Sequence, residues 1–202
     1  DTGTSVSSAG DINSDTFDDV IIGASKADPN GSTSGASYVV FGRNVDYVWP
    51  GALDLSSLDG SNGFVINGVS AGDESGTAVS GAGDINLDGF NDLFIGAPFA
   101  DPNGSGSGAS YVVFGSDQAW PGSLNLSGLD GNNGFVINGV SAGDNSGSSV
   151  SDAGDINGDG IADLITGAPL ASPNGQYSGT SYVIFGNSGD EVDEIFADSF
   201  ES

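Results

Sequence analysis

Short apolar segments separated by polar turns recur along this chain and predict an all-β protein. In the first repeat, four segments predict strands, at residues 5–9, 19–22, 36–41 and 63–67. The first alternates polar and apolar residues, as a half-buried strand does, whereas the continuous apolar run of the second indicates burial on both faces. Stretches rich in Gly, Pro, Asn and Ser separate the four and predict turns.

The same four-segment unit is present three times. Val6-Ser-Ser-Ala-Gly-Asp-Ile-Asn13 returns, with small changes, 73 residues later from Val79 and a further 71 residues later from Val150. The spacing from the Asp of this motif to the Tyr of a later Tyr-Val-x-Phe-Gly motif is 27 residues in every copy. A unit that keeps its internal spacing while a connector varies in length behaves as a packed core joined by a tolerant loop.

Four short strands in each unit predict propeller-type blades, open or completed by oligomerisation. We divide the chain into repeat 1 (1–73), repeat 2 (74–144), repeat 3 (145–189) and an acidic tail (190–202). Repeat 3 has no match to the Phe-Val-Ile-Asn strand of residues 64–67. The tail is expected to replace that strand, through Ile195, Phe196 and Phe200, or to pair with another chain; an acidic terminus without a strand is the alternative.

Charge and composition exclude several classes of function. The 28 acidic residues against 2 basic ones give a net charge of −26, so binding to nucleic acid or to an anionic membrane is not expected. No apolar run is long enough to span a bilayer. Histidine and cysteine are absent, which excludes disulfides, imidazole or thiolate metal sites, and nucleophiles that depend on either residue. The acidity fits a soluble surface, halophilic adaptation, or cation binding, and the arrangement of the acids favours the last.

Each repeat carries one acidic loop of nine residues directly after its first predicted strand. Oxygen-bearing side chains stand at loop positions 1, 3, 5 and 9, and an apolar residue at position 7 is expected to offer its backbone carbonyl. The predicted metal ligands are Asp11, Asn13, Asp15, Phe17 and Asp19 in repeat 1, Asp84, Asn86, Asp88, Phe90 and Asp92 in repeat 2, and Asp155, Asn157, Asp159, Ile161 and Asp163 in repeat 3.

This ligand pattern predicts three Ca²⁺ sites. Calcium takes six to eight hard oxygen ligands, and the first half of an EF-hand loop uses the same odd-numbered spacing; Mg²⁺ prefers fewer protein ligands. The loops are not EF-hands, because strands flank them and no Glu stands at position 12. Acidic turns that only cap backbone N–H groups are the alternative interpretation. Thr16 replaces the Gly at position 6, so the site of repeat 1 is expected to be the weakest, and that of repeat 3 the tightest.

The combined pattern Gly-Asp-Ile-Asn-x-Asp-Gly-x-x-Asp-Leu-x-x-Gly-Ala-Pro, followed by Tyr-Val-x-Phe-Gly, resembles the FG-GAP repeats of the integrin α-subunit head and of bacterial extracellular proteins. The resemblance covers about residues 1–189, although repeat 1 has Ser25 in place of the Pro of the Gly-Ala-Pro element. It implies four-stranded propeller blades with Ca²⁺ held between the first two strands, in an extracellular or cell-surface protein. The family's closed propellers have seven blades, and three blades cannot close such a ring.

Three functions remain open at this level. An enzyme is disfavoured, because nearly every recurring Asp has a place in a predicted metal loop, although a two-carboxylate hydrolase is conceivable. The expected function is that of a calcium-binding extracellular module, either in structural self-assembly as a ring or filament, or in cell-surface adhesion to another extracellular protein or a glycan. A ligand-binding propeller segment of a larger secreted protein or enzyme is the alternative. Trp49 and Trp120 lie in the variable connectors and are expected to pack beneath them rather than to face a partner.

Overall fold

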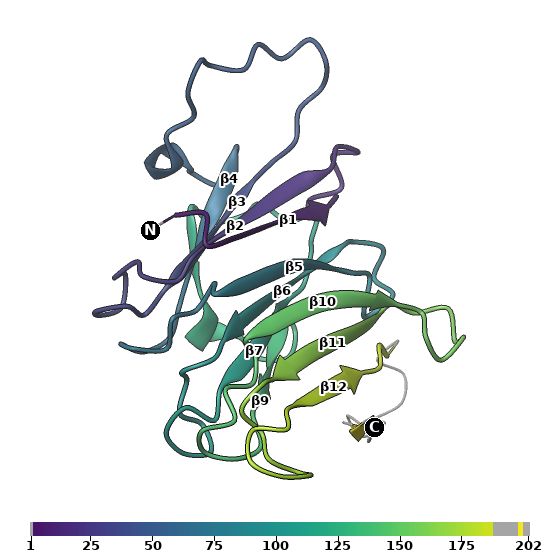
Figure 1. Cartoon of the computed structure of the whole chain (residues 1–202). Coiled ribbons are helices and arrows are strands. Elements are labelled where there is room, and N and C mark those ends of the chain that lie inside the picture. Colours follow the sequence, from purple (N-terminus) through teal and green to yellow (C-terminus); the bar gives the residue numbers. More distant parts are fainter. Residues whose placement is uncertain (1, 188–197, 200–202) are drawn as a thin grey trace.

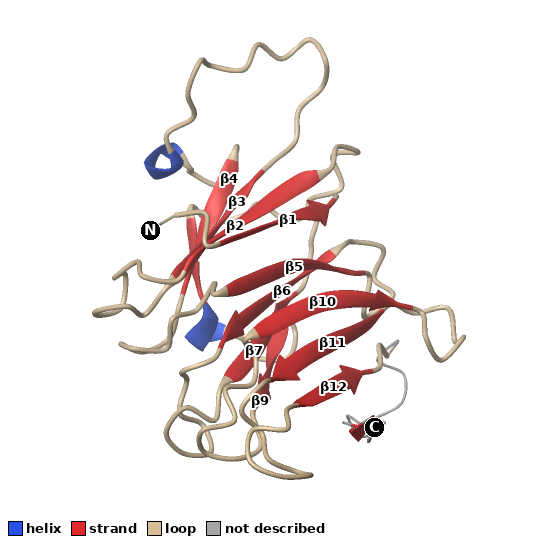
Figure 2. Cartoon of the chain, viewed as in Figure 1, coloured by secondary structure: helices blue, strands red, loops and turns tan. Residues whose placement is uncertain are grey.

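The computed structural model describes residues 2–187 and 198–199, and its regular elements are almost all strands (Figures 1 and 2). The strands are β1 (Ser5–Gly10), β2 (Asp19–Ala24), β3 (Ala36–Val40), β4 (Gly63–Asn67), β5 (Ala78–Gly83), β6 (Asp92–Ala97), β7 (Ala109–Val113), β8 (Ser123–Asn125), β9 (Gly134–Asn138), β10 (Ser149–Gly154), β11 (Asp163–Ala168), β12 (Thr180–Ile184) and β13 (Asp198–Ser199). Two single-turn 3₁₀ helices, η1 (Leu55–Ser57) and η2 (Leu126–Gly128), interrupt the connectors. The all-β prediction is confirmed, and the four strands expected in repeat 1 begin and end within two residues of those observed.

Each repeat forms one antiparallel sheet, here called a blade, with its strands in chain order. Blade 1 is β1-β2-β3-β4, blade 2 is β5-β6-β7-β9, and blade 3 is β10-β11-β12-β13. A bulge interrupts the pairing of the first two strands at the same place in each blade, between Ser8 and Gly10 in blade 1. Gly10 has a φ of +65°, which glycine adopts without strain. The bulge ends the first strand immediately before the acidic loop.

The apolar core lies between the blades, which stack side by side as propeller blades do (Figure 1). One cluster joins blades 1 and 2 and includes Ile21, Phe64 and Leu93; a second joins blades 2 and 3 around Phe94 and Leu164. The expected burial of the second strand on both faces is confirmed for β6, in which all six residues are buried. It is wrong for β2, where Val20 is 44% exposed, because the described residues include no blade before blade 1 to cover that face.

The connector of repeat 2 crosses onto blade 1, which the sequence did not indicate. Its short strand β8 pairs in parallel with β4, aligning Val65 with Ser123 and Asn67 with Asn125. The ring of Trp120, just before β8, is partly buried against the core between blades 1 and 2. The packing expected for Trp120 is therefore confirmed, whereas Trp49 at the matching place in repeat 1 is 49% exposed.

The fourth strand of blade 3 comes from the tail. Within the described residues β13 pairs with β12 through Tyr182–Ser199 and Val183–Asp198, at the sheet position that β4 and β9 occupy in the other blades. Ile195, Phe196 and Phe200, the expected replacements for the missing apolar strand, lie outside the described residues. The three blades form an open array within the part of the chain that the structure describes. No helix in that part is long and apolar enough to cross a membrane.

Candidate metal centre

The three acidic loops connect the first two strands of each blade and lie along one side of the molecule (Figure 1). Their oxygen-bearing side chains at positions 1 and 3 converge on one backbone N–H group, that of position 5. In repeat 1 the Asp15 amide donates to Asp11 Oδ1 at 3.1 Å and to Asn13 Oδ1 at 3.0 Å. The same two bonds occur in repeat 2 at 3.1 and 3.1 Å and in repeat 3 at 3.1 and 2.9 Å. The ligands predicted at positions 1 and 3 are thus brought together in every loop.

Position 5 is tied into the same arrangement. Asp159 Oδ1 accepts the Ile161 amide at 2.8 Å, and its Oδ2 accepts Asn157 Nδ2 at 2.8 Å. The Asp155 carboxylate accepts from the Gly160 amide at 2.8 Å, which closes the turn. Matching bonds exist in the other two repeats. The loop backbone therefore holds the side chains at positions 1, 3 and 5 in one orientation.

Position 9 fastens the loop to the blade. Asp92 is fully buried; its Oδ2 accepts the Ile85 amide of its own loop at 2.9 Å, and its Oδ1 accepts the Gly115 amide beyond β7 at 2.8 Å. Asp19 and Asp163 make the equivalent pairs of bonds. Each of these carboxylate oxygens accepts one backbone hydrogen bond and retains a second lone pair. These three residues were predicted as metal ligands only, and the structure gives them a role in joining loop and sheet as well.

The Gly that follows the third strand is a functional position that sequence reasoning missed. Gly115 donates to Asp92, and a Cβ on it would lie 2.3 Å from Asn91 O and 2.7 Å from Phe90 Cβ. Gly42 and Gly186 are as tightly enclosed, against Phe17 and Ile161. The signal was present, because each of these glycines ends the recurring Tyr-Val-x-Phe-Gly motif. The position-7 side chain packs over this glycine, with Ile161 buried and Phe17 and Phe90 half-buried.

Two turn positions adopt the left-handed conformation. At position 6, φ is +74° for Thr16, +91° for Gly89 and +90° for Gly160. The expectation that the calcium site of repeat 1 is the weakest assumed this left-handed conformation. Position 4 is also left-handed, with φ of +59° at Ser14, +58° at Leu87 and +79° at Gly158. Repeat 1 thus has no glycine at either position, repeat 2 has one, and repeat 3 has two. Backbone strain in the loops decreases in that order.

The carboxylates of a loop repel one another. Burial raises the pKa of Asp19 to about 6 and that of Asp92 to about 7, against the opposing effect of their backbone hydrogen bonds. The negative charges of Asp15 and Asp11 raise the pKa of Asp19 further, and those of Asp88 and Asp84 act in the same way on Asp92. A bound cation would relieve this repulsion.

The donor set fits a hard cation, although the loops are not closed around one. Each loop offers only carboxylate, amide and carbonyl oxygens, which suit Ca²⁺. The described residues contain no group of three or more acidic side chains arranged to hold a metal ion as they stand. The capping of backbone N–H groups, which the alternative interpretation expected, is present in all three loops. Capping and cation binding are compatible, since most of the capped oxygens accept a single hydrogen bond and keep a lone pair; Asp155 Oδ1, which accepts the Gly158 and Asp159 amides, is the exception among the predicted ligands. Calcium binding stays a prediction.

Fold and loops together define an all-β protein of repeated propeller-type blades with an acidic hairpin loop in each. The FG-GAP repeat family matches residues 2–40, 75–113 and 146–184, once in each predicted repeat. The chain therefore belongs to the FG-GAP repeat family, which confirms the resemblance found in the sequence.

Relatives of two kinds share this module. Phosphatidylinositol-glycan-specific phospholipase D of Bos taurus is 30% identical over 182 residues, which is 85% of this chain and 20% of that protein. Integrin alpha pat-2 of Caenorhabditis elegans is 38% identical over 110 residues, 52% of this chain and 9% of the integrin. Integrin alpha-PS5 of Drosophila melanogaster is 47% identical over 49 residues, 24% of this chain and 4% of that protein. The chain spans a fifth or less of each of these relatives.

Proposed function

We propose that this chain is a calcium-stabilised, non-catalytic FG-GAP module that acts outside the cell in self-assembly or adhesion. The observation that carries the proposal is the repetition of one hydrogen-bonded arrangement of Asp, Asn and Asp in three loops. Three bound Ca²⁺ ions would change the formal charge from −26 to −20. Binding only to the folded chain would add RT ln(1 + [Ca²⁺]/Kd) of stability for each site.

The absence of catalysis is part of the proposal. Histidine and cysteine are absent from the sequence, and the buried loop aspartates at position 9 already serve the fold. Burial gives the raised pKa of Asp92 a structural cause, so the raised pKa does not by itself indicate an acid–base catalyst. The extracellular location follows from the likeness to integrin α chains and is proposed with the rest.

A second candidate function is a ligand-binding propeller segment within a larger secreted protein or enzyme. The observation that favours it is the phospholipase D relative, of which the matched region makes up only 20%. In that case the blades would bind, and any catalysis would belong to another domain. Both proposals predict that this chain alone does not hydrolyse phosphodiesters, so an assay for that activity tests the absence of catalysis in either case. Self-association of the isolated chain, which only the first proposal expects, separates the two.

The calcium proposal is tested by thermal unfolding in millimolar Ca²⁺ and in excess chelator, with metal content measured by elemental analysis. Extracellular modules bind Ca²⁺ with Kd on the order of 10⁻⁴–10⁻³ M, so the melting temperature should rise over that range. A melting temperature that is the same in Ca²⁺ and in chelator, for protein shown to be metal-free, would reject the calcium sites.

A matched pair of variants separates cation binding from simple capping. Asp159 Oδ1 in a loop accepts the amide two residues on at 2.8 Å, and Asp130 Oδ1 outside the loops does the same at 2.9 Å. Both side chains are exposed, and Asn preserves the capping bond in either place. Asp159→Asn should reduce the calcium-dependent rise in melting temperature by the contribution of one of the three sites. Asp130→Asn should leave that rise unchanged. Equal effects of the two variants would favour capping alone.

A further inference from the structure

Gly35, Gly108 and Gly179 occupy the same position in the three repeats but differ in which backbone atoms pack against them. A Cβ on Gly35 would lie 2.1 Å from Ser75 O, and a Cβ on Gly108 would lie 2.1 Å from Ser146 O. The third, Gly179, has a nearest neighbour at only 3.6 Å, Pro169 O. The backbone of a following repeat therefore covers the first two positions, and Gly179 remains open among the described residues.

The covering segment is the stretch that precedes the first strand of the next repeat. Ser75 forms a parallel bridge with Gly35, and its amide donates to Ser34 O at 3.2 Å. Ser146 forms the same bridge with Gly108, and its amide donates to Ser107 O at 3.1 Å. Ser75 and Ser146 are 1% and 2% exposed. The contact is therefore a regular feature of the blade-to-blade interface.

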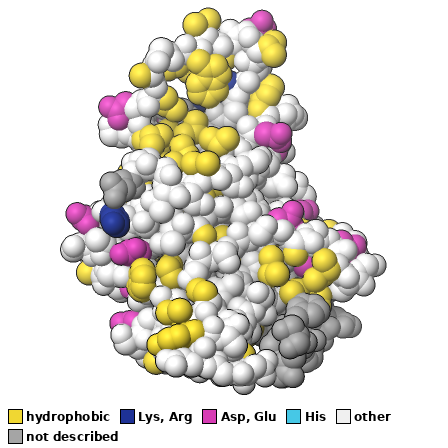
Figure 3. Space-filling model, in the orientation of Figure 1, with side chains coloured by type: hydrophobic (Ala, Val, Ile, Leu, Met, Phe, Trp, Pro, Cys, Tyr) yellow, Lys and Arg dark blue, Asp and Glu magenta, His cyan; other side chains and the backbone are white. Residues whose placement is uncertain are grey.

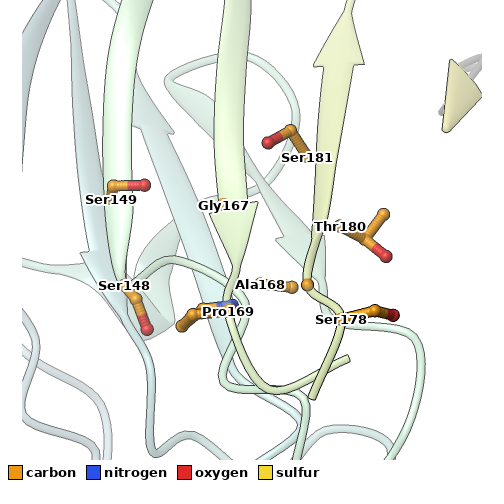
Figure 4. Close-up of a pocket in the computed structure, with 9 residues that line it drawn as sticks. Ser148, Ser149, Gly167, Ala168, Pro169, Ser178, Thr180 and Ser181 are labelled. Atoms are coloured by element: carbon orange, nitrogen blue, oxygen red, sulfur yellow. The ribbon is translucent and has the colours of Figure 1, made fainter. Parts of the chain in front are cut away.

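At the end of blade 3 the corresponding place is a hollow of about 560 Å³ (Figure 4). Its lining includes Gly167, Pro169, Ser178, Gly179 and Ser181. In Figure 4 the side chains of Ser148 and Pro169 lie beside the end of β11, and Ser181 lies across from them on β12. Gly167 is the counterpart of Gly96, whose added Cβ would meet Gly147 O at 2.0 Å; at Gly167 the same atom would meet only the side chain of Ser149.

The chain carries a matching segment at its other end. Thr2-Gly3-Thr4 precedes β1 as Ser75-Gly76-Thr77 precedes β5, in the same register relative to the strand. All three residues are exposed. A Cβ on Gly3 would meet nothing within 4 Å, whereas one on Gly76 would meet Ala36 O at 2.5 Å. Among the described residues, the segment that contacts a preceding blade at Ser75 and Ser146 is therefore uncovered at Thr2–Thr4.

The apolar faces at the two ends repeat this relationship. Val6 is 68% exposed and its counterpart Val79 is 5% exposed. At the other end Phe185 is 38% exposed, whereas its counterparts Phe41 and Phe114 are buried and half-buried. The rings of Phe41 and Phe114 each lie 5.9 Å from a phenylalanine in the fourth strand of their own blade. The long connector after β3 adds Val45, Val48 and Trp49 to the exposed apolar surface of blade 1, where Figure 3 shows hydrophobic side chains gathered near the top of the molecule. Within the part of the chain that the structure describes, blade 1 and the hollow of blade 3 each expose one half of an interface that the chain makes twice.

We propose that a second copy of this chain docks head to tail: its Thr2–Thr4 segment enters the hollow beside Gly179, and its blade 1 packs against blade 3. A second copy is the occupant because its blade 1 has Gly3 and Val6 where blade 2 uses Gly76 and Val79 for the same contact, with Thr2 in the place of Ser75. Such a heterologous contact builds a ring if its rotation closes and a filament if it does not. The inference rests on the self-assembly part of the proposed function and is independent of the calcium sites. Like charges on the copies oppose the contact, so association should increase with ionic strength.

The test blocks one end at a time. Val6→Asp places a charge on the exposed face of blade 1, and Ser181→Phe fills the hollow at blade 3. Val140→Asp is the matched control, because Val140 is 59% exposed and lies in neither end face. Sedimentation velocity over a range of protein concentrations should show larger species for the natural sequence and for Val140→Asp. Either blocked variant alone should be a monomer.

A mixture of the two blocked variants decides the matter. Each retains the end that the other has lost, so together they should form a one-to-one dimer and nothing larger, which also shows that both are folded. A natural chain that stays monomeric at all concentrations, a blocked variant that still associates alone, or a mixture that stays monomeric would overturn the proposal. The same runs in chelator separate it from the calcium proposal: a dimer there, with no calcium effect on melting, would reject the sites and keep the interface.

Discussion

The ring of Trp120 stacks on the ring of Phe64, with centroids 4.3 Å apart and ring planes 10° from parallel. Phe64 belongs to the fourth strand of blade 1, whereas Trp120 belongs to the connector of repeat 2. Phe64 is fully buried as a result. The connector of one repeat thus completes the core of the preceding one, which is why the blades depend on their neighbours for stability.

Truncating the two connector tryptophans should have unequal effects. Trp120→Ala should lower the free energy of unfolding by about 3–5 kcal/mol, because it removes a ring packed in the core. Trp49→Ala should change it by less than about 0.5 kcal/mol in dilute protein, where that ring contacts mainly Tyr47. Urea unfolding followed by circular dichroism gives both values. Similar losses would contradict the difference in packing.

Removing backbone strain at the left-handed turn positions should strengthen the weaker calcium sites. Thr16→Gly removes a β-branched residue at a φ of +74° and should increase the calcium affinity of repeat 1 about five- to tenfold, as expected for about 1 kcal/mol of strain. Gly160→Thr is the reciprocal change and should weaken repeat 3. Titration calorimetry of both variants is the measurement. The order would be refuted if Thr16→Gly bound no more tightly than the natural sequence.

The position-9 aspartate should matter to the fold even without metal. Asp92→Ala leaves the Ile85 and Gly115 amides unpaired in a buried site, at a cost of about 1–3 kcal/mol for each. Asp88→Ala, in the same loop but exposed, should cost less than about 1 kcal/mol in chelator. Unfolding in excess chelator compares the two. A larger loss for Asp88→Ala would show that charge repulsion, rather than the buried bonds, dominates the metal-free loop.

Tyr111 should make the chain sensitive to alkaline pH. Burial, with a smaller effect of the Asp73 charge, raises the pKa of Tyr111 from 10.0 to about 12. The folded chain therefore binds this proton more tightly than the unfolded chain, and the resulting stability is complete below pH 10 and lost as pH rises towards 12. Tyr111→Phe should flatten this part of the profile. Melting temperatures between pH 9 and pH 12 test the prediction, and identical slopes for both proteins would contradict it.

The strands and acidic loops were predictable because their signals are local. Alternation, continuous apolar runs and turn residues located β1 to β4, and spacing alone identified the loop residues that converge on the Asp15 amide. The left-handed position 6 also followed from the recurring glycine. Position 4 was missed, because Ser14 and Leu87 give no sign of a positive φ.

Contacts between repeats could not be read in this way. Nothing near β8 indicates that it pairs with β4, and Trp49 and Trp120 have almost the same neighbours in the sequence, Pro and Gly among them. Their different exposure depends on whether another blade lies beside them. The hydrogen bond that the Gly115 amide donates to Asp92 likewise joins residues 23 apart, which only the folding of a blade brings together.

By itself, the sequence determined the repeat, the four strands of repeats 1 and 2, the first three strands of repeat 3 and the oxygen side chains of each loop, because backbone preference and residue spacing act over a few neighbours. Only the tertiary structure decided which faces are covered, since burial depends on what lies across the gap between blades. Val6 and Val79 occupy the same place in the same motif, yet one is 68% exposed and the other 5%. The difference between them is the presence of a preceding blade among the described residues, which no property of the motif itself encodes.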